Sequence, residues 1–136
     1  MGEKLMRILL YDDDKCYCVL FRNSLSKNIE FDFATSRRTF FYKLKQKNYD
    51  VVFVDFFLGK QTALEVLDQW ELQNESVAPV ILLSSSFENL LFCQNHAPKP
   101  SSIIGYISKW EAPQKVVTYA QSQLKEKGIL KFVPAA

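Results

Sequence analysis

Hydrophobic positions along the chain gather in five short segments that are separated by longer amphipathic stretches. The segments are Arg7–Tyr11, Ile29–Ala34, Val51–Val54, Val80–Leu83 and Ile103–Ile107. Short runs that are almost continuously apolar are typical of strands covered by helices on both faces. Ile29–Ala34 differs from the others, because it alternates apolar and acidic residues. This alternation predicts a strand with one face in water, at the edge of a sheet.

The stretches between these segments carry apolar residues at helical spacing. Thr62–Glu65 forms a T-x-x-E capping box, Pro113 suits the first turn of a helix, and Gly128 suits the position just after a helix end. Ser86 is placed to cap a short helix that contains Leu90 and Leu91. The predicted helices are Lys15–Asn28, Arg37–Lys47, one from Thr62, one from Ser86 and one from Pro113 to Gly128.

Strand and helix patterns therefore alternate five times along the chain. Regular alternation predicts a parallel sheet with helices on both faces. An edge position for the second strand fits the doubly wound, flavodoxin-like order 2-1-3-4-5. We predict an α/β domain over residues 5–127 and a C-terminal tail over residues 128–136.

Length and composition agree with one water-soluble domain. The 136 residues are 48% hydrophobic and 24% charged, with a net charge of only +2. This balance gives no general attraction to nucleic acid or to an anionic membrane. No apolar run approaches the ~20 residues that span a bilayer, and no secretory signal follows the first residues. We expect a cytoplasmic protein without nucleic-acid or membrane partners. Its cysteines, Cys16, Cys18 and Cys93, lack zinc spacing and are expected to be reduced.

Charged and hydroxyl residues follow every predicted central strand. In a doubly wound sheet the carboxyl ends of the strands meet at one rim, where ligands bind. Each residue also has an ordinary explanation, since aspartates and serines cap helices or form turns and lysines are commonly solvated. The residues at this rim are Asp12, Asp13 and Asp14 after the first strand, Asp55 after the third, Ser84, Ser85 and Ser86 after the fourth, and Ser108 and Lys109 after the fifth.

The combination predicts a cation site that faces a phosphoryl group. Carboxylates that meet at one rim repel each other unless a cation lies among them. Mg²⁺ prefers hard oxygen ligands, keeps several waters and takes one or two carboxylates directly. A lysine and a hydroxyl opposite that cation suit the oxygens of a phosphoryl group.

Over about residues 5–127 the chain resembles the receiver domain of bacterial response regulators in two-component signalling. The family pattern departs here at Gly59 and Ala63, which stand where proline and glycine are usual, and at Trp110, where a proline usually follows the lysine. We therefore expect unusual loops after the third strand and around Lys109. The matching residues are Asp12 and Asp13 in LLYDDD, Asp55 in YDVVFVD, Ser84 in PVILLSS, and Tyr106 and Lys109 in YISK.

The resemblance implies that Asp55 accepts a phosphoryl group with the help of Mg²⁺. Asp13 and Asp55 are then direct metal ligands, Asp12 acts through a water, and Phe57 supplies a backbone carbonyl. Ser84 and Lys109 each hold a phosphoryl oxygen. On this interpretation the chain is no enzyme beyond its own Mg²⁺-dependent phosphorylation.

The resemblance also implies the partners. The phosphoryl donor is a histidine kinase or a phosphotransfer protein of a phosphorelay. Ser84 and the aromatic switch residue Tyr106 report phosphorylation to the face of the fourth strand, the fifth strand and the last helix. That face, which includes Leu90, Leu91 and Lys115, binds a downstream protein or a second copy of the chain.

Other functions remain open at this point. A degenerate receiver that binds proteins without phosphorylation is one, favoured by Gly59, Ala63 and Trp110. An aspartate-dependent phosphohydrolase is disfavoured, because Phe57 stands where such enzymes carry a second Asp. A dinucleotide site is disfavoured as well, because no G-x-G-x-x-G follows the first strand.

Overall fold

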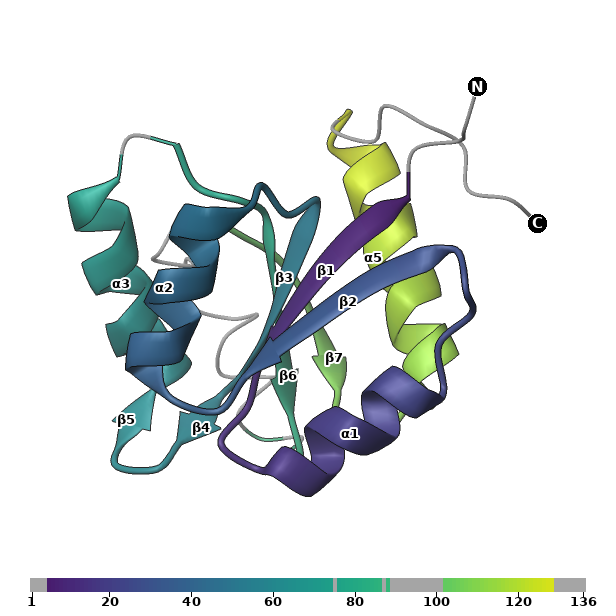
Figure 1. The fold of residues 1–136 in the computed structure, drawn as a ribbon, viewed down its shortest axis with the longest axis horizontal. Coiled ribbons are helices and arrows are strands. Elements are labelled where there is room, and N and C mark those ends of the chain that lie inside the picture. Colours follow the sequence, from purple (N-terminus) through teal and green to yellow (C-terminus); the bar gives the residue numbers. More distant parts are fainter. Residues whose placement is uncertain (1–4, 75, 87, 89–101, 129–136) are drawn as a thin grey trace.

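The computed structural model describes residues 5–74, 76–86, 88 and 102–128 (Figure 1). It contains a five-stranded parallel sheet in the order β2-β1-β3-β6-β7. This is the predicted 2-1-3-4-5 order, and the α/β fold class is confirmed. The strands of this sheet are β1 (Met6–Tyr11), β2 (Ile29–Ala34), β3 (Val51–Asp55), β6 (Val80–Ser84) and β7 (Ile103–Ser108).

Helices cover both faces of the sheet. Helices α2 (Arg37–Gln46) and α3 (Ala63–Gln73) lie on one face, and α1 (Lys15–Asn23) and α5 (Pro113–Glu126) lie on the other (Figure 1). The predicted helix around Leu90 and Leu91 lies outside the described residues. No helix in the described part of the chain combines the length and apolarity needed to cross a membrane.

The burial of the strands follows their hydrophobic patterns. Every residue of β3 and β6 is buried, whereas β2 is half-buried along most of its length. Alternate residues feed two apolar clusters, so that Val52 packs toward α2 and α3 while Phe53 packs toward α1 and α5. The prediction of central strands with a second strand at the edge is therefore confirmed.

Helix α1 is shorter than the predicted range of Lys15–Asn28, because it ends at Asn23. The Ser24 hydroxyl donates a hydrogen bond to the Leu20 carbonyl at 2.8 Å, inside the last turn. Serine side chains that bond the backbone in this way compete with helix propagation. The predicted end of the last helix is correct, since Gly128 has a φ of 70° and its N–H donates to the Lys125 carbonyl at 3.0 Å.

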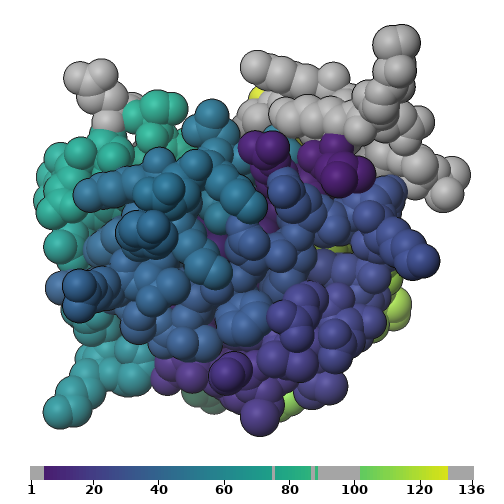
Figure 2. Space-filling model, viewed as in Figure 1, coloured from purple at the N-terminus to yellow at the C-terminus, as the bar shows by residue number. Residues whose placement is uncertain are grey.

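The segment after β3, for which the sequence predicts an unusual loop, forms a small antiparallel hairpin. Its strands are β4 (Phe57–Leu58) and β5 (Gln61–Thr62). Gly59 has a φ of 65° at the first of the two loop positions, as a type II′ turn requires. Thr62 then caps α3 and accepts the Glu65 N–H at 3.4 Å, as predicted. The hairpin protrudes at the lower left of the molecule (Figures 1 and 2).

Tyr119 of α5 reaches across the edge strand β7. Its hydroxyl accepts the Tyr106 N–H at 3.1 Å, which satisfies a backbone donor at the sheet edge. The ring crosses directly over Gly105, where a Cβ would lie 2.6 Å from the Tyr119 hydroxyl and 3.0 Å from Ile81 Cδ1. Glycine is therefore needed at this position for close packing of helix against strand.

Gly105→Ala should lower the free energy of unfolding by about 1–3 kcal/mol, the usual cost of overpacking a core. Urea unfolding, followed by tryptophan fluorescence, measures this loss. The cost should be smaller in a Tyr119→Phe background, because the nearest clashing atom is then absent. If Gly105→Ala costs the same free energy of unfolding in both backgrounds, the Tyr119 hydroxyl is not the atom that makes a Cβ at this position unfavourable.

Candidate functional site

The carboxyl ends of the central strands bring the predicted rim residues together. Asp12 follows β1, Asp55 ends β3, Ser84 ends β6 and Lys109 follows β7. The parallel pairing of β1 with β3 and of β3 with β6 places these ends side by side, along the lower edge of the sheet in Figure 1. Asp14 has a different role: its side chain caps α1 by accepting hydrogen bonds from the N–H groups of Cys16 and Tyr17.

Asp12, Asp13 and Asp55 form an acidic cluster. Each offers one carboxylate oxygen, and these oxygens lie within 4.8 Å of one another. Asp12 is fully buried and Asp55 is 7% exposed, whereas Asp13 faces solvent. A site with hard oxygen donors that is open to water on one side fits Mg²⁺, which keeps part of its hydration shell.

Lys109 supplies the positive charge of this cluster. Its Nζ lies 2.7 Å from Asp12 Oδ2 and 3.4 Å from Asp55 Oδ2. The contact with the fully buried Asp12 is the closer of the two, and it pairs a buried carboxylate with the ammonium. Carboxylate oxygens at this rim also suit the coordination shell of a cation, either directly or through a water.

The cluster carries more negative charge than Lys109 balances. Burial and then the Asp12 charge raise the pKa of Asp55 from 3.8 to about 7, against the lowering effect of Lys109. Burial also raises the pKa of Asp12. Burial alone would lower the pKa of Lys109, but the two carboxylates outweigh it and raise that pKa. A further cation is therefore electrostatically favoured at this rim.

Ser84 and Tyr106 lie on the two strands beside the cluster. Ser84 is 1% exposed, and its hydroxyl accepts the Ser86 N–H at 3.0 Å. The Ser84 carbonyl accepts the Lys109 N–H at 2.9 Å, which ties β6 to the lysine loop. Tyr106 is half-buried on β7, and its ring packs against the apolar cluster under α2 and α3.

The remaining predicted residues that the structure describes, Phe57 and Lys115, are not members of the acidic cluster. Phe57 lies on β4 and is 51% exposed, and its role as a backbone ligand stays a prediction. Lys115 is exposed on α5, where its Nζ lies 3.9 Å from Glu111 Oε2. Leu90 and Leu91 fall outside the described residues.

Among the described residues, Tyr17 also contacts the candidate site, although the sequence did not indicate it. Its hydroxyl donates to the Lys109 carbonyl at 3.3 Å, and Lys109 Nζ lies 4.5 Å from the centre of its ring. Burial, together with the charges of Asp12 and Asp55, raises its pKa, so the phenol keeps its proton. In the sequence, the feature that could have pointed to Tyr17 is its position in the first turn of α1, shortly after Asp12, Asp13 and Asp14.

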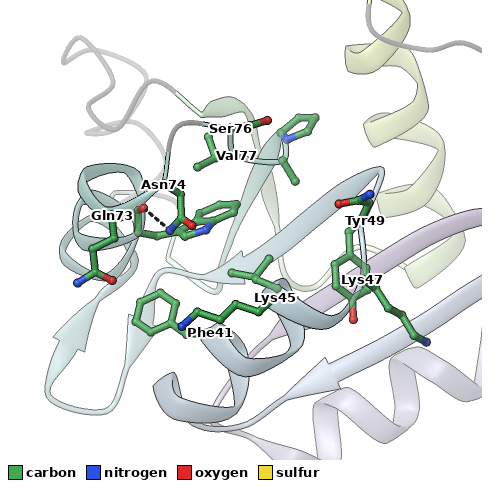
Figure 3. Close-up of a pocket in the computed structure, with 13 residues that line it drawn as sticks. Phe41, Lys45, Lys47, Tyr49, Gln73, Asn74, Ser76 and Val77 are labelled. Carbon is green, nitrogen blue, oxygen red and sulfur yellow. Dashed lines mark hydrogen bonds between the residues drawn. The ribbon is translucent and has the colours of Figure 1, made fainter.

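A cavity of about 550 Å³ lies between α2 and α3, near the amino ends of β3 and β6 and away from the acidic cluster (Figure 3). Two of its polar groups are engaged: the Tyr49 hydroxyl donates to Asp32 at 2.7 Å, and Asn74 donates to the Trp70 carbonyl at 2.9 Å. The described residues that line it include no carboxylate, thiol or imidazole. The acidic rim is therefore the stronger candidate for chemistry.

Comparison with known proteins supports a receiver-type domain. No family model matches the chain. Transcriptional regulatory protein QseB of Haemophilus influenzae is 36% identical over 81 residues, which are 59% of this chain. The match spans 36% of the length of that relative, so the similarity concerns only one part of a longer protein.

Solved structures extend the comparison to almost the whole chain. The signal receiver domain of an HD domain-containing protein from Pseudomonas fluorescens matches with a TM-score of 0.74 and 20% identity, covering 94% of this chain and 93% of that one. Response regulator TrrA from Thermotoga maritima, in complex with Mg²⁺ and BeF, matches with a TM-score of 0.70 and 21% identity, covering 88% and 100%. The fold is that of response regulator receiver domains, and the resemblance seen in the sequence is confirmed.

Proposed function

We propose that this chain is a phosphoacceptor receiver domain of two-component signal transduction, with Asp55 as the acceptor. The observation that carries the proposal is the meeting of Asp12, Asp13 and Asp55 with Lys109 at the carboxyl rim of a receiver-type sheet. The solved complex of TrrA with Mg²⁺ and BeF is consistent with such a role.

In the proposed reaction, an Asp55 carboxylate oxygen attacks the phosphorus of the donor. A new O–P bond forms as the bond to the leaving group breaks, and the electron pair departs with that group. Asp13 and Asp55 would hold Mg²⁺ directly, with Asp12 acting through a water and the Phe57 carbonyl as a further ligand. When bound, the ion would neutralise charge on the phosphoryl oxygens.

Lys109 and Ser84 receive the transferred group in this proposal. The Lys109 ammonium sits on a flexible stem and pairs with Asp12 and Asp55 before the reaction. It turns to a phosphoryl oxygen once Asp55 is modified, while the Ser84 hydroxyl leaves the Ser86 N–H for another oxygen. The chain performs no catalysis beyond its own phosphorylation.

The donor in this proposal is a histidine kinase or a phosphotransfer protein in the cytoplasm. The signal leaves through the face of β6, β7 and α5 to a downstream protein or to a second copy of the chain. The bond from the Tyr106 N–H to the Tyr119 hydroxyl supports this route, because it links the switch residue to α5. Movement of the Tyr106 ring then shifts an existing equilibrium of that face.

Intact-protein mass spectrometry after incubation with acetyl phosphate tests the proposal. With Mg²⁺ the protein should gain the mass of one phosphoryl group, and with a chelator the yield should fall at least ~10-fold, because negative donors are repelled by the acidic cluster. Absence of the adduct, despite Mg²⁺ binding shown by calorimetry, would favour a degenerate receiver. In that case the acidic cluster would bind the ion without phosphoryl transfer to Asp55.

A further inference from the structure

Tyr17 contacts Lys109 at both ends of the lysine. The phenol hydroxyl donates to the Lys109 backbone carbonyl at 3.3 Å, while the aromatic face lies 4.5 Å from the Lys109 ammonium. The first contact fixes the main chain, and the second is a cation–π contact with the charged end of the side chain. Tyr17 therefore restrains both the backbone of Lys109 and the ammonium end of its side chain.

The position of Tyr17 is itself well defined. Asp14 caps α1 and accepts the Tyr17 N–H at 3.3 Å, which fixes the backbone in the first turn. The ring is half-buried and packs against Phe21, with ring centres 5.9 Å apart. A half-buried tyrosine with a bonded hydroxyl has little rotational freedom, so it can act as a fixed support.

Among the described residues, the other hydrogen bonds that hold the backbone of the Lys109 loop are donated by its N–H groups. The Lys109 N–H bonds the Ser84 carbonyl at 2.9 Å, and the Trp110 N–H bonds the Ser108 hydroxyl at 3.2 Å. Both bonds hold N–H groups toward β6 and β7, whereas Tyr17 holds the Lys109 carbonyl toward α1. The Trp110 side chain is 75% exposed and contributes little packing.

We propose that Tyr17 is a positioning residue that aims the Lys109 ammonium at the phosphoacceptor site. This role rests on the proposed function, because it concerns the same reaction at Asp55. A lysine has four rotatable side-chain bonds, and a support that removes wrong conformers raises the fraction ready to bind a phosphoryl oxygen. Tyr17 does this without touching the phosphoryl group itself.

Tyr17→Phe keeps the ring and removes the hydroxyl. The rate of Asp55 phosphorylation by acetyl phosphate at saturating Mg²⁺ should fall about fivefold, the equivalent of a hydrogen bond worth about 1 kcal/mol. Tyr17→Leu also removes the cation–π contact and should slow the reaction about tenfold or more. Tyr42→Phe, at an exposed tyrosine of α2, is the matched control and should leave the rate unchanged.

A double-mutant cycle with Lys109→Ala separates positioning from general structural damage. If Tyr17 acts through Lys109, Tyr17→Phe should change the rate less than about 1.5-fold once Lys109 is alanine. A fivefold loss in both backgrounds would overturn the proposal. Absence of phosphorylation in the unmutated protein would instead overturn the proposed function, and with it this role.

Proton NMR of the unphosphorylated protein gives an independent readout. The Tyr17 ring should shift the ε-methylene protons of Lys109 upfield, because the ammonium lies over its face. Tyr17→Leu should return these protons to the shifts of a solvated lysine, while Tyr17→Phe should largely preserve them. Unchanged Lys109 shifts in Tyr17→Leu would show that the ring does not support the lysine, even if phosphorylation itself proceeds.

Discussion

Asp55→Asn should abolish the phosphoryl adduct completely, because the amide keeps the shape of the side chain but lacks a nucleophilic carboxylate oxygen. Asp55 ends a fully buried strand and is 7% exposed, so its oxygens are confined to the acidic rim. Mass spectrometry after incubation with acetyl phosphate and Mg²⁺ should show the unmodified mass only. An adduct that persists in Asp55→Asn would place the acceptor at another residue.

Variants of the neighbouring charges should have graded effects in the same assay. Asp13→Asn removes an exposed carboxylate of the cluster, so it should raise the Mg²⁺ concentration needed for half-maximal rate while leaving the acceptor intact. Lys109→Ala should permit phosphorylation and slow it. Asp68→Asn, at an exposed carboxylate on α3, is the matched control and should behave as the unmutated protein.

The sequence predicts most of the sheet because the central strands leave no ambiguity in their pattern. Val51–Val54 and Val80–Leu83 are continuously apolar, and both are buried on their two faces. The acidic alternation of Ile29–Ala34 identifies the edge strand. Strand order then follows from the alternation of strands and helices, which allows few connections in a parallel sheet.

Short features are harder to predict, since their stability comes from tertiary contacts. The β4–β5 hairpin has two paired residues on each strand, too few to show a periodic pattern. Helix α1 ends at Asn23, where the Ser24 hydroxyl bonds the Leu20 carbonyl, although apolar spacing continues as far as Leu25. Hydrophobic periodicity therefore locates helices better than their last turns.

In the candidate site, too, some residues could be predicted from the sequence and others could not. Asp12, Asp55, Ser84 and Lys109 could be predicted because each stands at a strand end, where chain position determines place in the sheet. Tyr17 could not be assigned, because its contact with Lys109 joins residues that are 92 positions apart. Whether its ring faces the lysine or the solvent depends on the packing of α1 against the loop after β7.

The same acidic rim should make the metal-free protein less stable as the pH rises. Burial and the Asp12 charge raise the pKa of Asp55 to about 7, whereas an unfolded aspartate titrates near 3.8. Between these values the folded chain holds a proton that the unfolded chain has released. The free energy of unfolding therefore falls with rising pH across this window and levels off above about pH 7.

Asp55→Asn should consequently stabilise the metal-free protein at pH 8 by about 2–4 kcal/mol, since a shift of one pKa unit corresponds to about 1.4 kcal/mol. Asparagine removes the buried charge that repels Asp12, and Lys109 keeps its ion pair with Asp12. At pH 4 the gain should largely vanish, because Asp55 is then protonated in the folded protein. Loss of function and gain of stability would thus arise from the same carboxylate.

Urea unfolding at pH 4, 6 and 8 in the presence of a chelator measures this effect, with Asp68→Asn as the control for a carboxylate on an exposed helix surface. Adding Mg²⁺ at pH 8 should stabilise the unmutated protein, by about 2.7 kcal/mol at a hundred times the dissociation constant, and should stabilise Asp55→Asn much less. The variant would then lose its advantage over the unmutated protein. If Asp55→Asn is no more stable than the unmutated protein without metal at pH 8, Lys109 alone balances the acidic cluster, and the electrostatic reason for a cation at this rim is wrong.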